Sequence, residues 1–266
     1  MKCYQRVIRE SALPEPDEEI KRALAQDFSH ASVREIDFET AKPLVLKYEW
    51  LRTMGSGRWF WGLYFGEHLA GVAVFGTSAG TRVAESIAGI ENANRVCELV
   101  RGLCLPWAHQ HSASWFIPQA CKLMADKYGK NIFVAYATDA AGEVGQIYSS
   151  LNWIYTGRTQ AAQQFVLDGK IRDSRQISNL ARDGRPNKGE TQKYRRSRAE
   201  QKKLLLEQGA VFIPGTPKHR FVGIYGSPLM VKGLRKALKL PSGPYPKRND
   251  ALVVETGLSE MGCTGQ

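Results

Sequence analysis

The order of helix and strand signals between residues 37 and 175 constrains the fold of this chain more than any other feature. Apolar runs of strand length alternate there with segments in which apolar residues recur at helical spacing. This alternation predicts an α/β sheet whose strands run in both directions. The predicted elements are, in order, a helix over 37–51, a hairpin over 59–76, a strand over 94–106, a helix over 112–129 that Ser112 caps and Pro118 shifts or kinks, a strand over 131–139, a short helix over 142–152, a strand over 153–158 and a hairpin over 164–175 that turns at Asp168-Gly169.

This order is that of the core of the GCN5-related N-acetyltransferases (GNAT). We therefore expect an α/β, GNAT-like fold in which helices flank a mixed sheet, followed by a basic C-terminal extension. The chain has 266 residues, 43% of them hydrophobic, which is enough apolar material for one sizeable core. We divide it into an N-terminal extension (1–30), a GNAT-like catalytic core (31–175), a basic segment with the part that completes the core (176–225) and a basic tail (226–266).

The stretch LVRGLCLPWAHQHSAS, residues 99–114, joins a predicted strand to a predicted helix. In a fold of this kind the N-terminal amides of that helix face a pyrophosphate. The small residues at the helix start allow close approach of the backbone, and the two basic residues add positive charge. We expect an acyl-CoA site formed by Arg101, His111, Ser112, Ala113 and Ser114. The stretch lacks the glycines of the usual R/Q-x-x-G-x-G/A loop, and a helix that Ser112 simply caps is the alternative interpretation.

Basic residues exceed acidic ones by 37 to 26, giving a formal net charge of +11, which favours an anionic partner such as nucleic acid. Residues 182–203 concentrate this charge, with nine Lys/Arg against three Asp/Glu and no core-forming apolar run. This composition predicts a loop followed by a solvated helix. We expect Arg195, Arg196 and Arg198 to contact phosphates of a nucleic-acid backbone, and a solvated linker face is the alternative.

Cysteine usage and hydropathy predict a compartment rather than an activity. The five cysteines form an odd count without C-x-x-C spacing, which is typical of a reducing environment without a disulfide framework or a zinc knuckle. The sequence contains no run of about eighteen apolar residues, and its N-terminus lacks the apolar region of a secretory signal. We therefore expect no membrane partner.

Four stretches in register resemble the Mom family of bacteriophage DNA-modification proteins. They are KYEWLRTMGSG (47–57), ELVRGLCLPWAHQHSAS (98–114), TDAAGEVGQIYSSLNWIYTG (138–157) and PKHRFV (217–222), and the similarity covers residues 28–225. The resemblance implies a GNAT-like enzyme of the host bacterial cytoplasm that acts on double-stranded DNA. It would convert the exocyclic amine of adenine to a methylcarbamoyl derivative and so protect phage DNA from restriction enzymes. The resemblance also implies a requirement for acetyl-CoA and for iron.

Four residues are the candidates for catalysis under this resemblance. Tyr148 occupies the place where many acetyltransferases keep a tyrosine acid near the cofactor sulfur. Tyr48 would stack on or bond a flipped adenine, and a half-buried helix tyrosine is the alternative. Asp139 follows a buried strand and would orient a polar partner or act as a base, unless it only caps the next helix. His219 would touch DNA phosphate or assist at the amine.

Two further groups of residues receive roles by the same resemblance. Tyr64 and Tyr148 are the candidate iron contacts, since phenolate oxygen suits ferric iron, although the spacing shows no metal motif. Lys218 and Arg220 flank His219 and are candidate DNA contacts.

Two other classes of function remain open at this point. The chain could be an acetyl-CoA-dependent N-acetyltransferase for a small molecule or a protein. It could also be a non-enzymatic DNA-binding protein that has kept a decayed GNAT fold.

Overall fold

A computed structural model of the chain describes residues 4–11, 16–78, 81–161, 163–173, 177 and 197–247. The chain divides into two compact units. The core unit consists of Met1–Arg158 and His219–Gln266, and the inserted unit consists of Thr159–Lys218. No helix among the described residues is long and apolar enough to cross a membrane.

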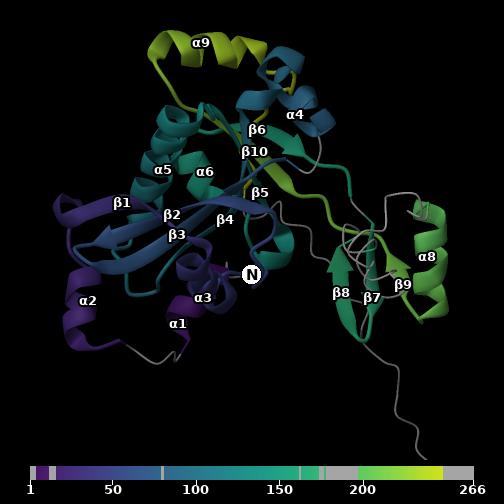
Figure 1. Ribbon diagram of the computed structural model, residues 1–266, viewed down its shortest axis with the longest axis horizontal. Helices are drawn as coiled ribbons and strands as arrows, with labels where there is room; N and C mark the ends of the chain where they lie inside the picture. Colours follow the sequence, from purple (N-terminus) through teal and green to yellow (C-terminus); the bar gives the residue numbers. More distant parts are fainter. Residues whose placement is uncertain are drawn as a thin grey trace, which may run out of the picture. The chain divides into compact units, whose positions relative to one another are not determined.

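The core unit is built on a seven-stranded sheet in the order β1-β2-β3-β4-β5-β10-β6 (Figure 1). Strands β4 and β5 run parallel, and the other neighbouring strands in this sheet are antiparallel. This mixed sheet, with β10 between β5 and β6, confirms the predicted α/β, GNAT-like fold class. The strands are β1 (Ala31–Ile36), β2 (Gly57–Phe65), β3 (His68–Gly76), β4 (Val96–Cys104), β5 (Ile132–Ala137), β6 (Ile154–Arg158) and β10 (His219–Ile224).

The local sequence explains most of these strands. The predicted hairpin of β2 and β3 is confirmed, and its turn contains Gly66 in a left-handed conformation, with φ of 58°. The predicted buried strand is β5, and five of its six residues are buried. The strand predicted over 94–106 is β4, which begins later because residues before Val96 form the short 3-10 helix η2 (Ile90–Arg95).

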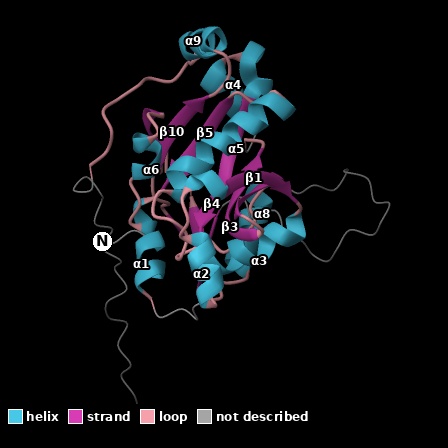
Figure 2. Ribbon diagram, turned by 90° about the vertical axis from the view of Figure 1, so that its left-hand side faces the viewer, coloured by secondary structure: helices cyan, strands magenta, loops and turns pink. Residues whose placement is uncertain are grey.

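Helices cover both faces of the sheet (Figure 2). One face packs against α2 and α5, in a core that includes Leu24, Phe116 and Met124. On the other face, α1 and α3 pack near β3, while α4 and α9 pack near β5 and β10. Their bounds are α1 (Tyr4–Glu10), α2 (Glu18–Leu24), α3 (Phe38–Tyr48), α4 (Thr81–Ala88), α5 (Ser112–Tyr128), α6 (Gln146–Ser150) and α9 (Pro228–Ala237), with the further 3-10 helices η1 (Phe28–His30) and η3 (Asp139–Ala141).

The start of α5 corrects two expectations. His111 occupies the N-cap position, so Ser112 is the first helical residue and not the cap. The Ser112 hydroxyl is buried and has no hydrogen-bond partner among the described residues. Pro118 lies inside the helix and does not move its start. Because proline has no amide hydrogen, the carbonyl of Ser114 lacks the donor that would otherwise complete its helical hydrogen bond.

The inserted unit has its own small sheet, in the order β8-β7-β9, beside helix α8. The predicted hairpin turn is confirmed, since Asp168 and Gly169 both have positive φ, at 53° and 69°. Helix α8 begins with a capping box formed by Ser197 and Glu200. The elements are β7 (Gln164–Leu167), β8 (Lys170–Asp173), β9 (Val211–Ile213) and α8 (Arg198–Glu207).

Candidate active site at the splay between β4 and β5

The two parallel strands at the centre of the sheet pair over only part of their length. Residues 96–98 of β4 face residues 132–134 of β5. Beyond this point β4 stays paired with β3, and β5 stays paired with β10. The strands therefore separate, and we call the region at their carboxyl ends the splay. Ligands of open α/β sheets bind at such carboxyl ends.

Asp139 lies just after β5 and forms a buried polar chain with His219. The Nε2 atom of His219 is 3.1 Å from Asp139 Oδ1, and Arg158 Nη1 donates to Asp139 Oδ2 at 2.7 Å. On its other side, His219 Nδ1 is 3.0 Å from the hydroxyl of Tyr155. The side chains of Asp139 and His219 are only 2% and 1% exposed. Two of the four predicted catalytic residues therefore meet directly.

Strand pairing explains this meeting. His219 faces Ala137 on β5 and Arg158 on β6. Because alternate residues of a strand point to opposite faces, His219 shares the face of Phe221, which belongs to the core beside α5. Nothing in the local sequence singles out Tyr155 or Arg158, and both escaped the sequence analysis. Only the insertion of β10 between β5 and β6 brings these residues to His219.

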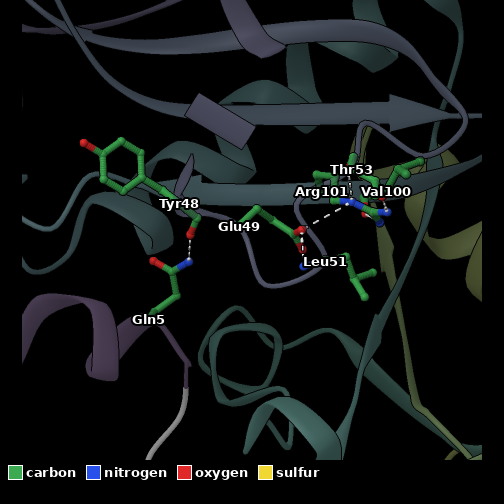
Figure 3. A network of polar contacts seen from close by, with 7 residues as sticks. All are labelled: Gln5, Tyr48, Glu49, Leu51, Thr53, Val100 and Arg101. Atoms are coloured by element: carbon green, nitrogen blue, oxygen red, sulfur yellow. Dashed lines mark hydrogen bonds and ion pairs between the residues drawn. The ribbon is translucent and has the colours of Figure 1, made fainter. Parts of the chain in front are cut away.

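A second polar network fixes the splayed arm of β4 (Figure 3). Arg101 Nε lies 3.5 Å from Glu49 Oε2 and donates to the carbonyl of Thr53 at 2.7 Å. Its Nη2 donates to the Thr53 hydroxyl at 2.8 Å. The structure thus places Arg101, the predicted phosphate contact, in contact with the loop after α3.

Tyr48 ends α3 beside this network, but its ring points away from the Glu49 carboxylate (Figure 3). Tyr48 is 8% exposed, and its ring packs edge-on against that of Trp107, with the ring centroids 6.2 Å apart. Its backbone carbonyl accepts from Gln5 Nε2 at 3.3 Å. The structure does not bring the Tyr48 ring to Asp139 or His219.

Glu143 and Tyr148 lie in the segment that connects β5 to β6. Burial, together with the charge of Glu49, raises the pKa of Glu143 to about 7. Burial also raises the pKa of Glu49, although Arg101 opposes this. The Tyr148 ring packs on Trp153 and Phe221, and burial with the nearby charge of Glu143 raises its pKa above the usual range. Glu143 is a site residue that sequence reasoning missed, because its burial depends on the tertiary structure.

The first turn of α5 follows the splayed arm of β4 and retains unused donors. The amides of Ser112 and Trp115 donate to the carbonyls of His109 and His111. Within the described residues, no such acceptor meets the amides of Ala113 and Ser114. Together with the buried, unpartnered Ser112 hydroxyl, this gives the helix start the donors that an anionic group requires.

The structure separates the two tyrosines that the resemblance suggests for iron. Tyr64 lies on β2 with Arg34 over its ring, on the opposite face from its neighbours Leu63 and Phe65, which belong to the core beside α5. Tyr148 packs on Phe221 of β10, on that core's own face. Strands β2 and β10 are four positions apart in the sheet, a distance of roughly 19 Å. One ion cannot reach both, and the described residues contain no group of three His, Cys, Asp or Glu suited to a metal.

The predicted DNA contacts are spread over both units. Arg198 begins α8 and is exposed, and the amide of Lys218 donates to the Thr159 hydroxyl at 3.1 Å. Arg220 faces away from His219 along β10, and its Nε donates to the Thr156 hydroxyl at 2.9 Å. Arg195 and Arg196 lie outside the described residues.

Solved structures with a similar arrangement are acetyltransferases. The Bacillus subtilis acetyltransferase in complex with CoA is 10% identical, with a TM-score of 0.38, over 74% of this chain and 99% of that one. The ribosomal-protein-S5-alanine acetyltransferase from Vibrio fischeri is 6% identical, with a TM-score of 0.40, over 76% and 97%. The spermidine N-acetyltransferase from Vibrio cholerae is 8% identical, with a TM-score of 0.38, over 74% and 94%.

A search of curated proteins found no significant match. A model of the Mom protein family, in contrast, matches residues 30–247. This range contains all seven strands of the core sheet and every residue of the splay described above. The chain therefore belongs to the Mom protein family.

Proposed function

We propose that this protein modifies adenine in double-stranded DNA, converting its exocyclic amine to a methylcarbamoyl derivative that shields the DNA from restriction enzymes. The observation that carries the proposal is the splay of a Mom-family chain, where burial raises the pKa values of two nearby groups, Glu143 and Tyr148. Groups whose pKa values are shifted by burial and by neighbouring charges cluster at functional sites. The net charge of +11 supports a polyanionic substrate.

The start of α5 is the proposed binding site of an acyl-CoA. The amides of Ala113 and Ser114 and the hydroxyl of Ser112 have no partner in the described part of the chain, which suits a pyrophosphate. His111 would add positive charge there. Arg101, on the splayed arm of β4, would also add positive charge there while it remains paired with Glu49. When bound, acyl-CoA would supply an activated carbon.

Tyr148 is the proposed proton donor of the site. Its hydroxyl has no hydrogen-bond partner among the described residues, and its raised pKa keeps it protonated at neutral pH. Asp139 and His219 would form a second proton-exchanging pair, held in place by Arg158 and Tyr155. The separation of Tyr64 from Tyr148 does not fit a shared iron ion, so no role is derived for one.

DNA would be held through basic side chains of both units. Arg198 at the start of α8 and Lys218 are the proposed phosphate contacts among the described residues, together with Arg195 and Arg196 from the preceding segment. Arg220 is also a proposed DNA contact, and its hydrogen bond to Thr156 on β6 would hold its side chain in place. A base inside a duplex must be flipped out before its amine can react, at a cost of a few kcal/mol.

The proposal is tested by mass spectrometry of nucleosides from DNA of bacteria that express the protein. The parent protein should produce a modified deoxyadenosine, and Tyr148→Phe should abolish it, because the change removes only the hydroxyl. Tyr128→Phe is the matched control, since it also removes a tyrosine hydroxyl. Tyr128 lies at the C-terminal end of α5, away from the proposed acyl-CoA site at the start of that helix, and its hydroxyl bonds Glu35. Unmodified deoxyadenosine from the parent protein would overturn the proposal. An acetylated small molecule or protein in its place would establish the alternative acetyltransferase.

A further inference from the structure

The loop that follows α3 presents two large apolar side chains at the surface. Trp50 is 40% exposed and Leu51 is 49% exposed, and the two residues are consecutive in the chain. Single exposed apolar side chains are common on proteins, whereas apolar groups gathered within a basic and polar surface are typical of a binding site. We call Trp50 and Leu51 the apolar tip of this loop.

Polar contacts fix the loop of the apolar tip to the splayed arm of β4 (Figure 3). The Glu49 carboxylate accepts from the amide of Leu51 at 2.7 Å and lies 3.5 Å from Arg101. Arg101 in turn donates to the carbonyl of Thr53 at 2.7 Å. Between these anchors, Arg52 has φ of 49°, a left-handed conformation that a residue other than glycine keeps only where its surroundings hold it. The apolar tip therefore has a defined position beside the splay.

A ring contact supports the apolar tip from α1. The Trp50 ring meets the Tyr4 ring edge-on, with the ring centroids 5.3 Å apart. This contact holds the indole in place while much of it stays accessible to a binding partner. An aromatic ring that is fixed in advance loses little conformational freedom when another ring stacks on it.

The surroundings of the apolar tip are basic. Between residues 40 and 66 the only acidic residue is Glu49, and it is already paired with Arg101. Lys47 and Arg52, on either side of the tip in the chain, are exposed and form no ion pair with any described residue. Apolar groups between unpaired cations complement DNA, in which stacked bases lie between charged phosphates.

We propose that Trp50 and Leu51 act as a wedge that enters the DNA duplex where the target adenine leaves the stack, while Lys47 and Arg52 contact the adjacent phosphates. This inference rests on the proposed function, because an enzyme that acts on a base inside a duplex must first extrude that base. Proteins that unstack DNA frequently insert apolar side chains between base pairs. An indole ring stacks on any base, so the wedge offsets the stacking that extrusion breaks.

The first test measures base extrusion in the absence of acyl-CoA. The probe is the adenine analogue 2-aminopurine, whose fluorescence is quenched while it is stacked, placed in duplexes copied from plasmid segments that the parent protein modifies. The parent protein should raise this fluorescence, and the double variant Trp50→Ala, Leu51→Ala should reduce the rise about 10-fold or more. Trp50→Phe keeps an aromatic ring and should retain most of the rise. Leu229→Ala is the matched control and should equal the parent protein, since Leu229 is 82% exposed on α9, outside the splay.

The second test separates a wedge from a side chain that only supports the loop. A base in single-stranded DNA is already unpaired, so less work is needed to extrude it. The double variant should bind the duplex probe about 10-fold more weakly than the parent protein does, and it should lose much less affinity for the single-stranded probe. Arg52→Ala should lower the slope of log affinity against log salt for the duplex by about 0.9, because one phosphate contact is lost.

The outcomes distinguish the wedge from the proposed function. A full fluorescence rise with the double variant, no rise with a parent protein that modifies DNA, or an equal loss of affinity for both probes would overturn the inference while the proposed function stands. Binding of the parent protein to vesicles of anionic lipid, or a dimer that Leu51→Ala dissociates, would assign the apolar tip to a membrane or to a second copy of the chain. If the parent protein modifies no deoxyadenosine, the proposed function fails, and the wedge fails with it.

Discussion

Replacing Glu143 by glutamine should stabilise the folded protein at high pH and have less effect at low pH. Glutamine has the shape of a protonated glutamic acid but cannot ionise. Burial and the charge of Glu49 raise the folded-state pKa of Glu143 from 4.5 to about 7. The folded protein therefore binds this proton more tightly than the unfolded chain does. The stability that Glu143 contributes is fully present below about pH 4.5 and is lost as the pH rises through about 7.

The size of the effect follows from the same two values. A tenfold change in an acid dissociation constant corresponds to about 1.4 kcal/mol, so ionising Glu143 in the folded state costs about 3 kcal/mol more than in the unfolded chain. Between about pH 5 and about pH 8, the parent protein should lose about 2.5 kcal/mol of unfolding free energy relative to Glu143→Gln. All other titrating groups are shared by the two proteins, so they cancel in this difference.

Urea unfolding followed by tryptophan fluorescence measures the required free energies. The difference between Glu143→Gln and the parent protein should widen steadily as the pH is raised. Glu91→Gln, at an exposed carboxylate of η2 outside the splay, is the control, and its difference from the parent protein should stay constant over the same range. A constant difference for Glu143→Gln would show that the folded environment does not hold its proton, and the reasoning would be refuted.

Three further changes test other parts of the splay. Glu49→Gln removes the neighbouring negative charge, so the pKa of Glu143 should fall, and adding Glu143→Gln in this background should stabilise the protein at about pH 8 by less than it does in the parent protein. Gly145→Ala should destabilise the protein by about 1–3 kcal/mol in urea unfolding, because its Cβ would lie 2.2 Å from Phe221 and its φ is 80°; equal stability would contradict this packing. Ser114→Asp should weaken CoA binding in calorimetric titration while its melting temperature stays the same or rises, because negative charge at a helix start stabilises the helix but repels a phosphate. Unchanged CoA affinity would place the cofactor elsewhere.

The sequence by itself determined the elements whose signals are local. The hairpin of β2 and β3, the buried strand β5 and the turn at Asp168-Gly169 could be predicted because side-chain alternation and turn chemistry act within a few residues. The family could also be predicted from the sequence, because each of its motifs is a contiguous stretch of residues. Helix boundaries were predicted less well. The N-cap of α5 is His111 and not the predicted Ser112, because the boundary of a helix depends on the conformation of the loop that precedes it.

Only the tertiary structure decided how the site is composed. Asp139 and His219 were both candidates in the sequence, but their contact spans 80 residues and requires β10 to insert beside β5. Tyr64 and Tyr148 were candidates together, and the sheet places them on opposite faces. Glu143 carries no local signal at all. Its proton affinity arises from burial and from the charge of Glu49, and both depend on which distant segments of the chain the fold packs around it.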